Sequence, residues 1–275
     1  MRLDKYLAEA AVGTRKLVRE YVKDGKVTVN GQEASCPAME IEENKDQVAY
    51  LGKAVIHAGK SYFMFHKPAG CVTARKDEDY PTVLDYFKPE HQRGLFPVGR
   101  LDKDTEGLLL LTNDGEFSHS LMHPNQHVEK VYYFWALGSL DAKAIDSLKS
   151  GVKLPGAEVP AKAIQIEVRE QGRYQDWKDS FSFVDRKVIR IHPERQSVVS
   201  GYLTISEGRK HQVKRMLKAV GCYVIYLKRV AVGGIVLDET LKKGQYRELT
   251  KEEIRVLSTV GQQEPGSRSN RTNEN

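Results

Sequence analysis

Two helical patterns open the chain. Leu3 and Leu7 are four residues apart, so they share one face of a helix. The second pattern follows Thr14, a residue suited to cap a helix, and it stops near Gly25, a common helix end. Its apolar residues are Leu17, Val18, Tyr21 and Val22. Both patterns predict short helices, each with one buried face.

A strand and a tight turn follow these helices. Val27 and Val29 alternate with polar residues, which is typical of a half-buried strand. The Asn30-Gly31 pair then favours a two-residue hairpin turn. Residues 1–31 are therefore predicted to form a helix, a second helix and a hairpin.

From about residue 58 the chain changes to short apolar segments separated by turns. These segments are SYFMFHKPAG, GLLLLTNDGE, VYYFWALG, YLTIS and CYVIYL. One helical pattern interrupts them, in EGRKHQVKRMLKAVG, with apolar residues at Val213, Met216, Leu217 and Val220 and a stop at Gly221. This succession predicts an α+β domain with a mixed, mostly antiparallel sheet.

The length of 275 residues favours two domains. We predict a first domain over residues 1–57 and a second over residues 58–260, joined by residues near 51–58. Residues 261–275 have almost no apolar side chain, so we expect a disordered tail there.

Composition excludes several classes of protein. Hydrophobic residues make up 40% and charged residues 29%, and no apolar run approaches the roughly 20 residues that span a bilayer. The start lacks the apolar stretch of a signal peptide, so we expect a cytoplasmic protein with no membrane partner. Cys36, Cys71 and Cys222 are far apart and indicate neither a disulfide framework nor a zinc site. We expect them to be small core residues.

The net charge of +6 favours a polyanionic partner, and basic residues outnumber acidic ones in residues 1–31. The basic residues there include Arg2, Lys5, Arg15, Lys16, Arg19, Lys23 and Lys26. Such a surface suits contact with the phosphates of a nucleic acid. A solvated helix surface without a partner would have the same composition, so charge alone leaves both interpretations open.

The densest group of candidate catalytic residues is FPVGRLDKDTEGLLLLTNDGE, residues 96–116. It places Arg100, Asp102, Asp104 and Glu106 on a connection before a buried strand, which an Asn-Asp-Gly turn ends. A carboxylate on a loop that a rigid strand anchors suits catalysis. The same aspartates would also serve as turn caps. A third interpretation is a pair of magnesium ligands in an RNA-cleaving enzyme.

Three histidines give a weaker signal. His119, His123 and His127 are four residues apart, the spacing of a metal-binding helix face, but Pro124 interrupts that helix. We therefore predict no metal site.

Residues 1–50 resemble an S4 RNA-binding domain. The similar segments are the opening R-L-D-K-Y-L, the basic start Thr14-Arg15-Lys16 and the V-T-V-N-G hairpin. This resemblance implies that RNA is the partner of the basic surface, contacted by Arg2, Lys5, Arg15, Lys16, Arg19 and Lys26.

The carboxylate segment, G-R-L-D-x-D-T-x-G-L-L-L-L-T-N-D-G, resembles the catalytic motif of the pseudouridine synthases, specifically the RsuA/RluB/RluE/RluF branch. Three further segments follow the family order: His66-Lys67-Pro68-Ala69-Gly70, Glu129-Lys130-Val131-Tyr132, and EGRKHQVKRM with Arg209. With the S4 region, the resemblance covers residues 1 to about 258.

The resemblance implies the chemistry and the roles of four residues. Asp102 would act on the ribose while the uracil is detached at N1, turned and rejoined through C5, without a cofactor. Whether Asp102 attacks C1′ or removes the C2′ proton stays open. Arg209 would pair with Asp102 and keep it ionised, Tyr132 would stack on the target base, and Arg100 would enter the RNA stack where the nucleotide flips out.

Helix geometry gives a second argument for Arg209. If Ser206 caps the helix, Arg209 lies in the first turn, where a cation opposes the helix dipole. A buried aspartate or an RNA phosphate would then compensate. A side chain that points into solvent is the alternative.

Overall similarity favours a uridine in 16S rRNA of the small subunit as the target. A 23S rRNA target, as in the RluB, RluE and RluF relatives, is the close alternative, and a non-catalytic RNA-binding protein is another. We expect a monomer that acts on ribosomal RNA or a pre-ribosomal particle. Residues 168–200 are longer than the matching family segment, and an extended hairpin would explain them.

Overall fold

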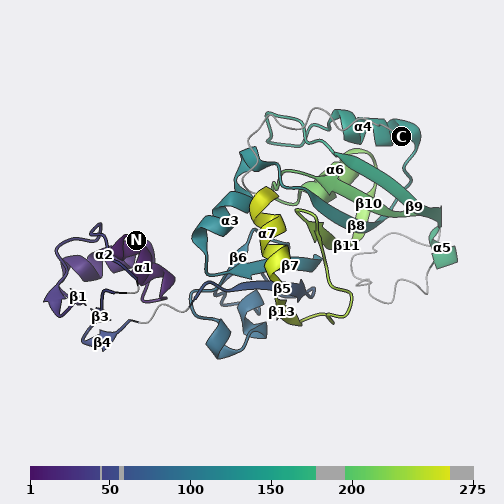
Figure 1. Cartoon of the computed structure of the whole chain (residues 1–275). Coiled ribbons are helices and arrows are strands. Elements are labelled where there is room, and N and C mark those ends of the chain that lie inside the picture. Colours follow the sequence, from purple (N-terminus) through teal and green to yellow (C-terminus); the bar gives the residue numbers. More distant parts are fainter. Residues whose placement is uncertain (44, 56–58, 178–195, 261–275) are drawn as a thin grey trace, which may run out of the picture.

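The computed structural model describes residues 1–43, 45–55, 59–177 and 196–260, which form a small N-terminal body and a larger second body (Figure 1). The elements of the small body are α1 (Leu3–Glu9), α2 (Arg15–Lys23), β1 (Val27–Val29), β2 (Gln32–Glu33), β3 (Val48–Tyr50) and β4 (Lys53–Ala54). Its strands pair in the order β2-β1-β3-β4.

The predicted helices and hairpin at the start of the chain are confirmed, but Leu17, expected on the buried face of the second helix, is 37% exposed. The Thr14 side chain accepts a hydrogen bond from the backbone N–H of Leu17 and caps α2. Asn30 and Gly31 both have positive φ, 53° and 80°, as a tight hairpin turn between twisted strands requires. The core of this body is closed mainly by buried residues of both helices and of β1: Leu3, Tyr6, Leu7, Val18, Val22, Val27 and Val29.

The connection predicted near residues 51–58 begins later than expected. Leu51 and Gly52 form a turn, and β4 after it pairs antiparallel with β3. Residues 51–54 therefore belong to the first sheet and are not a linker. This strand could not be predicted from the sequence, because both of its residues are exposed and it has no apolar alternation.

The second body is built on one large sheet. Its strands are β5 (Tyr62–Lys67), β6 (Phe96–Val98), β7 (Glu106–Thr112), β8 (Lys130–Leu137), β9 (Gln165–Arg173), β10 (Ser197–Ile205), β11 (Tyr223–Val232), β12 (Ile235–Val236) and β13 (Tyr246–Glu248). The main path runs β13-β5-β7-β11-β8-β10-β9, with β6 on β7 and β12 on β11. In the described residues β7 and β11 pair in parallel and the other pairs are antiparallel, so the predicted mixed sheet is confirmed.

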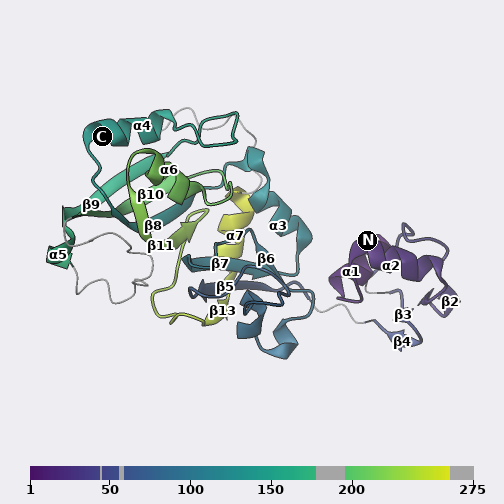
Figure 2. The ribbon, with the colours of Figure 1, turned by 180° about the vertical axis from the view of Figure 1, so that it is seen from behind.

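Strand β7 separates two hydrophobic cores, which explains its unbroken run of leucines. Leu109 and Leu111 belong to the core that includes α6 (Gln212–Ala219). Leu108 and Leu110 belong to the core on the other side, beneath α3 (Gly115–Met122) and α7 (Lys251–Val260). The two faces are seen in Figures 1 and 2, with α7 in front in the first view and α6 in front in the second.

Several helices have no counterpart in the sequence-based prediction. They are α3, α4 (Ala142–Ser150), α5 (Tyr174–Trp177), α7 and the short 3-10 helices η1 (Val83–Tyr86), η2 (Pro89–His91) and η3 (Pro124–Gln126). The predicted Asn-Asp-Gly turn is in fact the start of α3. The Asp114 side chain accepts hydrogen bonds from the backbone N–H groups of Glu116 and Phe117, at 3.0 and 3.2 Å.

Two other expectations concern the cysteines and the long insertion. Cys71 and Cys222 are buried, but Cys36 is exposed because it lies in the surface connection between β2 and β3. Within residues 168–200, β9 and β10 pair antiparallel, while residues 178–195 lie outside the described residues. The predicted tail, residues 261–275, also lies outside them. No described helix is long and apolar enough to cross a membrane.

Candidate active site

Asp102 lies on the loop between β6 and β7, and a buried lysine fixes this loop through hydrogen bonds to its backbone. Lys67, at the end of β5, is 0% exposed. Its ammonium donates hydrogen bonds to the backbone oxygens of Pro68, Asp102, Lys103 and Thr105, at 3.0, 3.1, 3.3 and 2.9 Å. Burial lowers the pKa of Lys67, and the four carbonyl oxygens replace the water that the ammonium has lost.

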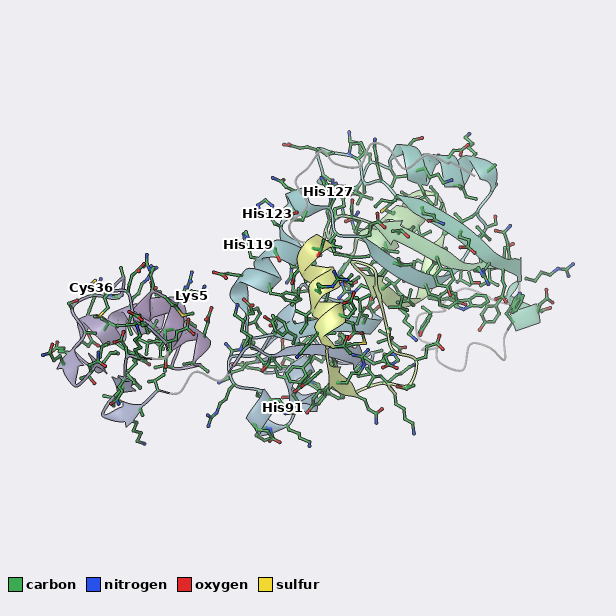
Figure 3. The ribbon with its side chains drawn as sticks, viewed as in Figure 1. Lys5, Cys36, His91, His119, His123 and His127 are labelled. Atoms are coloured by element: carbon green, nitrogen blue, oxygen red, sulfur yellow. The ribbon has the colours of Figure 1, made fainter. Side chains whose placement is uncertain are left out.

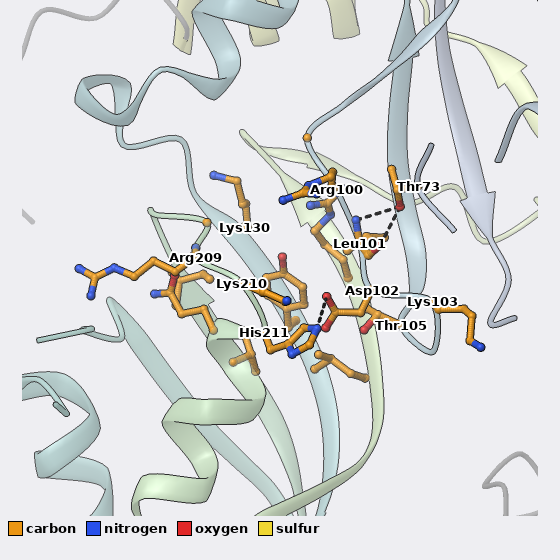
Figure 4. Close-up of a pocket in the computed structure, with 18 of the residues that line it drawn as sticks. Thr73, Arg100, Leu101, Asp102, Lys103, Thr105, Lys130, Arg209, Lys210 and His211 are labelled. Carbon is orange, nitrogen blue, oxygen red and sulfur yellow. Dashed lines mark hydrogen bonds and ion pairs between the residues drawn. The ribbon is translucent and has the colours of Figure 1, made fainter. Parts of the chain in front are cut away.

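A threonine fixes the other side of the loop. The Thr73 hydroxyl donates to the backbone oxygen of Leu101 at 2.7 Å and accepts from the backbone N–H of Leu101 at 3.1 Å (Figure 4). Asp102 is therefore flanked by two anchored peptide groups. Such support keeps a catalytic side chain in one geometry.

The start of β7 brings β11 close to this loop. Gly107 has φ of +105°, and a Cβ atom there would lie 2.1 Å from the backbone oxygen of Arg229. This glycine therefore permits the parallel pairing of Glu106 and Gly107 with Lys228 and Arg229. Glu106 was predicted to lie on the connection before the strand, but it is the first residue of β7 and is buried. It accepts hydrogen bonds from Tyr226 and Lys243, each at 2.9 Å.

Two side chains from the start of α6 face the Asp102 carboxylate. Lys214 Nζ lies 3.3 Å from Asp102 Oδ2, and His211 Nε2 lies 3.6 Å from Oδ1. Figure 4 shows the His211 ring directed at Asp102. Lys214 Nζ also forms a salt bridge with Asp104 at 2.5 Å, so one ammonium pairs with both carboxylates. The cation that pairs with Asp102 is Lys214, which the sequence analysis did not select.

The predicted ion pair between Arg209 and Asp102 is wrong. Arg209 Nε donates to Glu207 Oε2 at 2.8 Å, and its Nη1 donates to the backbone oxygen of Val159 at 2.5 Å. In Figure 4 the Arg209 side chain extends away from Asp102. Glu207, two residues away, supplies the nearer carboxylate.

The predicted start of the helix is also wrong. Helix α6 begins at Gln212, after His211 at φ of +51°, and not at Ser206. Arg209 therefore lies in the connection before the helix and not in its first turn. The sequence gives no signal that sets Lys214 apart from Arg209, because the choice between them depends on where α6 begins.

A pocket of about 540 Å³ opens above Asp102. Arg100, Tyr132 and Arg209, the residues predicted to bind substrate, all line it together with Asp102. Two buried cations that the sequence reasoning did not select, Lys130 and Arg229, line it as well. The pocket thus combines one partly exposed carboxylate, an aromatic ring and several cations, which suits a polyanionic substrate with a flat base.

The basic residues of the first body fall into two groups. Arg2 and Arg19 both pair with the buried Asp4, Lys5 pairs with Glu9 and with Glu116 of α3, and Lys26 pairs with Asp24. Arg15 and Lys16 are exposed at the start of α2 and have no acidic partner within the described part of the chain. These two have the most freedom to contact a phosphate.

The three histidines lie in succession along α3 and η3 (Figure 3). The rings of His119 and His123 are 5.2 Å apart, and His123 Nδ1 accepts a hydrogen bond from the backbone N–H of Asn125. No three His, Cys, Asp or Glu side chains of the described residues are grouped so that they would hold a metal ion.

Comparison with known proteins assigns this geometry to a family. A family model described as RNA pseudouridylate synthase matches residues 61–219, which contain Asp102 and α6, and an S4 domain model matches residues 1–46. The chain belongs to the RNA pseudouridylate synthase family. This confirms the family that the motif predicted, an enzyme class that isomerises uridine to pseudouridine in RNA, and the S4 domain before it.

Relatives of this family match nearly the whole chain. An uncharacterized RNA pseudouridine synthase, YtzG, of Bacillus subtilis is 40% identical, covering 94% of this chain and 98% of its own length. The ribosomal small subunit pseudouridine synthase A of Escherichia coli K12 is 38% identical, covering 92% and 98%. A solved pseudouridylate synthase structure, 33% identical, covers 94% of this chain and 99% of its own and superposes with a TM-score of 0.60.

Proposed function

We propose that this pseudouridine synthase acts on one uridine of 16S rRNA in the small ribosomal subunit, with Asp102 as its catalytic carboxylate. Similarity to relatives named ribosomal small subunit pseudouridine synthase A, over more than nine-tenths of the chain, supports the choice of RNA. A 23S rRNA target remains the alternative. That the protein is a monomer in the cytoplasm stays a prediction.

The observation that carries the catalytic assignment is the position of Asp102. Its side chain is 28% exposed at the floor of the pocket, beside Lys214 and on a loop fixed by Lys67 and Thr73. A carboxylate so placed is directed at a ligand in the pocket and has a cation beside it, as both proposed actions on the ribose require.

We assign the other pocket residues by their place around this carboxylate. Tyr132 stacks on the extruded uracil, because aromatic rings stack on unpaired bases. Arg100 is exposed at the pocket edge, where it enters the RNA stack that the target leaves. Arg209 contacts the RNA backbone from the opposite connection. Within the S4 domain, Arg15 and Lys16 contact phosphates, with Arg2, Lys5, Arg19 and Lys26 around them.

Release of tritium from uracil C5 tests this function. Pseudouridine formation replaces the C5 hydrogen with the bond to ribose, so the protein should release label from 16S rRNA labelled at C5 while the RNA chain stays intact. Asp102→Asn keeps the shape but removes the charge, and should stop release without weakening RNA binding much. A chelator should have no effect, since no metal takes part.

Asp104→Asn is the matched control. Asp104 is 71% exposed and shares Lys214 with Asp102, but it does not line the pocket. A nuclease with two carboxylate ligands would need both aspartates and would shorten the RNA. A non-catalytic RNA-binding protein would release no label. Release by Asp102→Asn at the wild-type rate would refute the catalytic assignment, and release from 23S rRNA alone would refute the choice of target.

A further inference from the structure

Two buried cations flank Tyr132 on the sheet wall of the pocket. Lys130 and Arg229 are only 6% and 3% exposed. Arg229 on β11 is the cross-strand partner of Tyr132 on β8, so the two side chains lie on the same face of the sheet. Lys130 precedes Tyr132 by two residues and shares that face as well. The base-stacking position is therefore bordered by two positive charges.

Within the described residues neither cation pairs with a carboxylate. Lys130 Nζ donates to the backbone oxygen of Val128 at 2.8 Å, and Arg229 Nε donates to that of Leu108 at 2.8 Å. An ammonium has three N–H donors and a guanidinium has five, so both groups have donors to offer a ligand. Burial, together with the charge of Arg229, lowers the pKa of Lys130 to about 8. Two adjacent buried cations are costly unless an anion joins them.

The position of the pair indicates which part of a nucleotide supplies that anion. Asp102 already has Lys214 and His211 beside it, so it does not need this pair. Arg100 and Lys210 are exposed pocket residues, where the phosphates of the RNA backbone pass. The buried wall beside Tyr132 is reached by the flipped base, while the phosphates stay with the strand outside.

We propose that Lys130 and Arg229 bind the uracil oxygens and stabilise the negative charge of the uracil after its detachment. This inference rests on the roles of Asp102 and Tyr132 proposed above. When the N1–C1′ bond breaks, its electron pair stays with the uracil and spreads over N1, O2 and O4. At the ribose, C1′ gains a bond to the Asp102 carboxylate, or the C2′ proton passes to that carboxylate.

The following steps return every group to balance. The uracil turns, its C5 bonds to C1′, and the ribose regains its starting state as Asp102 leaves or returns its proton. The C5 proton is lost and N1 gains a proton, so the product is an isomer of the substrate. Fixed cations lower the energy of the charged intermediate and also keep the detached base in the pocket.

Lys130→Met, compared on two substrates, tests the proposal. The first-order rate constant of a single turnover at saturating RNA should fall about 100-fold or more with uridine, as when one preorganised donor to a developing charge is removed. With 5-fluorouridine at the target position the loss should be clearly smaller. Fluorine withdraws electrons and makes the uracil a better leaving group, so the base needs less help. Consumption of either nucleoside is measured after digestion of the RNA.

Lys228→Met is the matched control, because Lys228 is the neighbour of Arg229 on the opposite face of β11. It should change neither rate constant much. Lys130→Arg keeps a cation and should retain more activity than Lys130→Met, and a thermal unfolding curve checks that each variant folds.

Two results would overturn the proposal. A weaker RNA Kd with an unchanged rate constant would mean that the pair binds a phosphate. An equal loss on both substrates, with a lower Tm, would mean that Lys130 only supports the fold. The comparison uses whichever rRNA the wild-type protein modifies, so a wrong choice of 16S rRNA leaves this test intact.

Discussion

At the scale of single residues, two lysines position Asp102 in different ways. Lys67 binds the backbone of the loop and fixes where the carboxylate sits, while Lys214 faces the carboxylate itself. The first interaction is buried and the second is partly exposed. Removal of Lys67 would therefore affect folding as well as catalysis. Removal of Lys214 should affect catalysis with little effect on folding.

Lys214→Gln should reduce turnover at least 10-fold with little loss of stability. The Asp102 and Lys214 side chains are 28% and 25% exposed, and ion pairs that water reaches contribute only about 0 to 1 kcal/mol to folding. The pair should matter more for the position of the Asp102 carboxylate in the pocket. Rates at saturating RNA and urea unfolding curves would measure both effects.

Arg209→Gln is the companion variant. It breaks the contacts to Glu207 and Val159 but leaves the cation beside Asp102 in place, so it should retain more turnover than Lys214→Gln and bind RNA less tightly. If Arg209→Gln instead lost more turnover than Lys214→Gln, the result would support the ion pair between Arg209 and Asp102 that the sequence suggested.

The sequence identifies several residues of the pocket but not the partner of Asp102. The family resemblance identified Asp102, and it also selected Arg100 and Tyr132, which line the same pocket. The partner of Asp102 depended on where α6 begins, and the left-handed backbone of His211, at φ of +51°, has no sequence signal. Lys130 and Arg229 are 99 positions apart in the chain, so only the strand register brings them together.

At the scale of elements, long apolar patterns were predicted well and short polar ones were not. The four leucines of β7 and the apolar stripe of α6 are visible because each element buries a complete face. Helix α4 buries Leu148 and little else, and α3 begins with glycine, so neither has a strong pattern. The start of α3 was predicted as a turn, because Asn-Asp-Gly is also a common turn sequence.

Asp114 caps α3 and gives an element-scale prediction that depends on pH. Burial alone would raise the pKa of Asp114, but Lys60, the Tyr62 hydroxyl and the Phe117 N–H outweigh it and lower the pKa below its ordinary 3.8. The unfolded chain then binds the proton more readily than the folded one. The stabilisation is complete above about pH 4 and is lost as pH falls through the folded-state pKa.

Asp114→Asn should therefore lower the free energy of unfolding by about 1 to 2 kcal/mol at pH 7, because Asn keeps a capping oxygen but loses the charge that binds Lys60. The difference from the wild type should shrink as the pH approaches 3, as measured by urea unfolding at several pH values. Asp141→Asn removes the charge from the cap of α4, which has no ion pair in the described residues, and so isolates the effect of the charge on the cap. A difference that stays constant from pH 7 to 3 would contradict the argument.

At the scale of the whole molecule, the S4 domain adds RNA contacts outside the pocket. It meets the second body through Lys5, whose ammonium lies 2.5 Å from Glu116 at the start of α3. Arg15 and Lys16 are on α2 of the same domain and remain available to the solvent. Binding and chemistry are thus divided between two bodies of one chain.

Replacement of both Arg15 and Lys16 by Gln should weaken binding and make it less sensitive to salt. Two lost phosphate contacts reduce the slope of log K against log salt by about 1.4 on single-stranded RNA. Turnover at saturating RNA should stay near the wild-type value. Lys143→Gln with Lys149→Gln, two exposed lysines of α4 far from the S4 domain in Figure 1, is the charge-matched control. An unchanged slope in the α2 variant would remove these residues from the interface.

Strand β7 also acts as a ruler for the catalytic carboxylate. Because positions 108–111 are all leucine, a shift of one residue would leave most core positions filled by leucine. It would, however, bring a residue with a Cβ atom to the position of Gly107, where that atom would lie 2.1 Å from the backbone oxygen of Arg229. The same shift would move Asp102 by about 3.3 Å and away from Lys214. The glycine that lets β7 pair with β11 therefore also fixes where the carboxylate lies, and the number of residues between Asp102 and Gly107 is as much a part of the catalytic apparatus as the carboxylate itself.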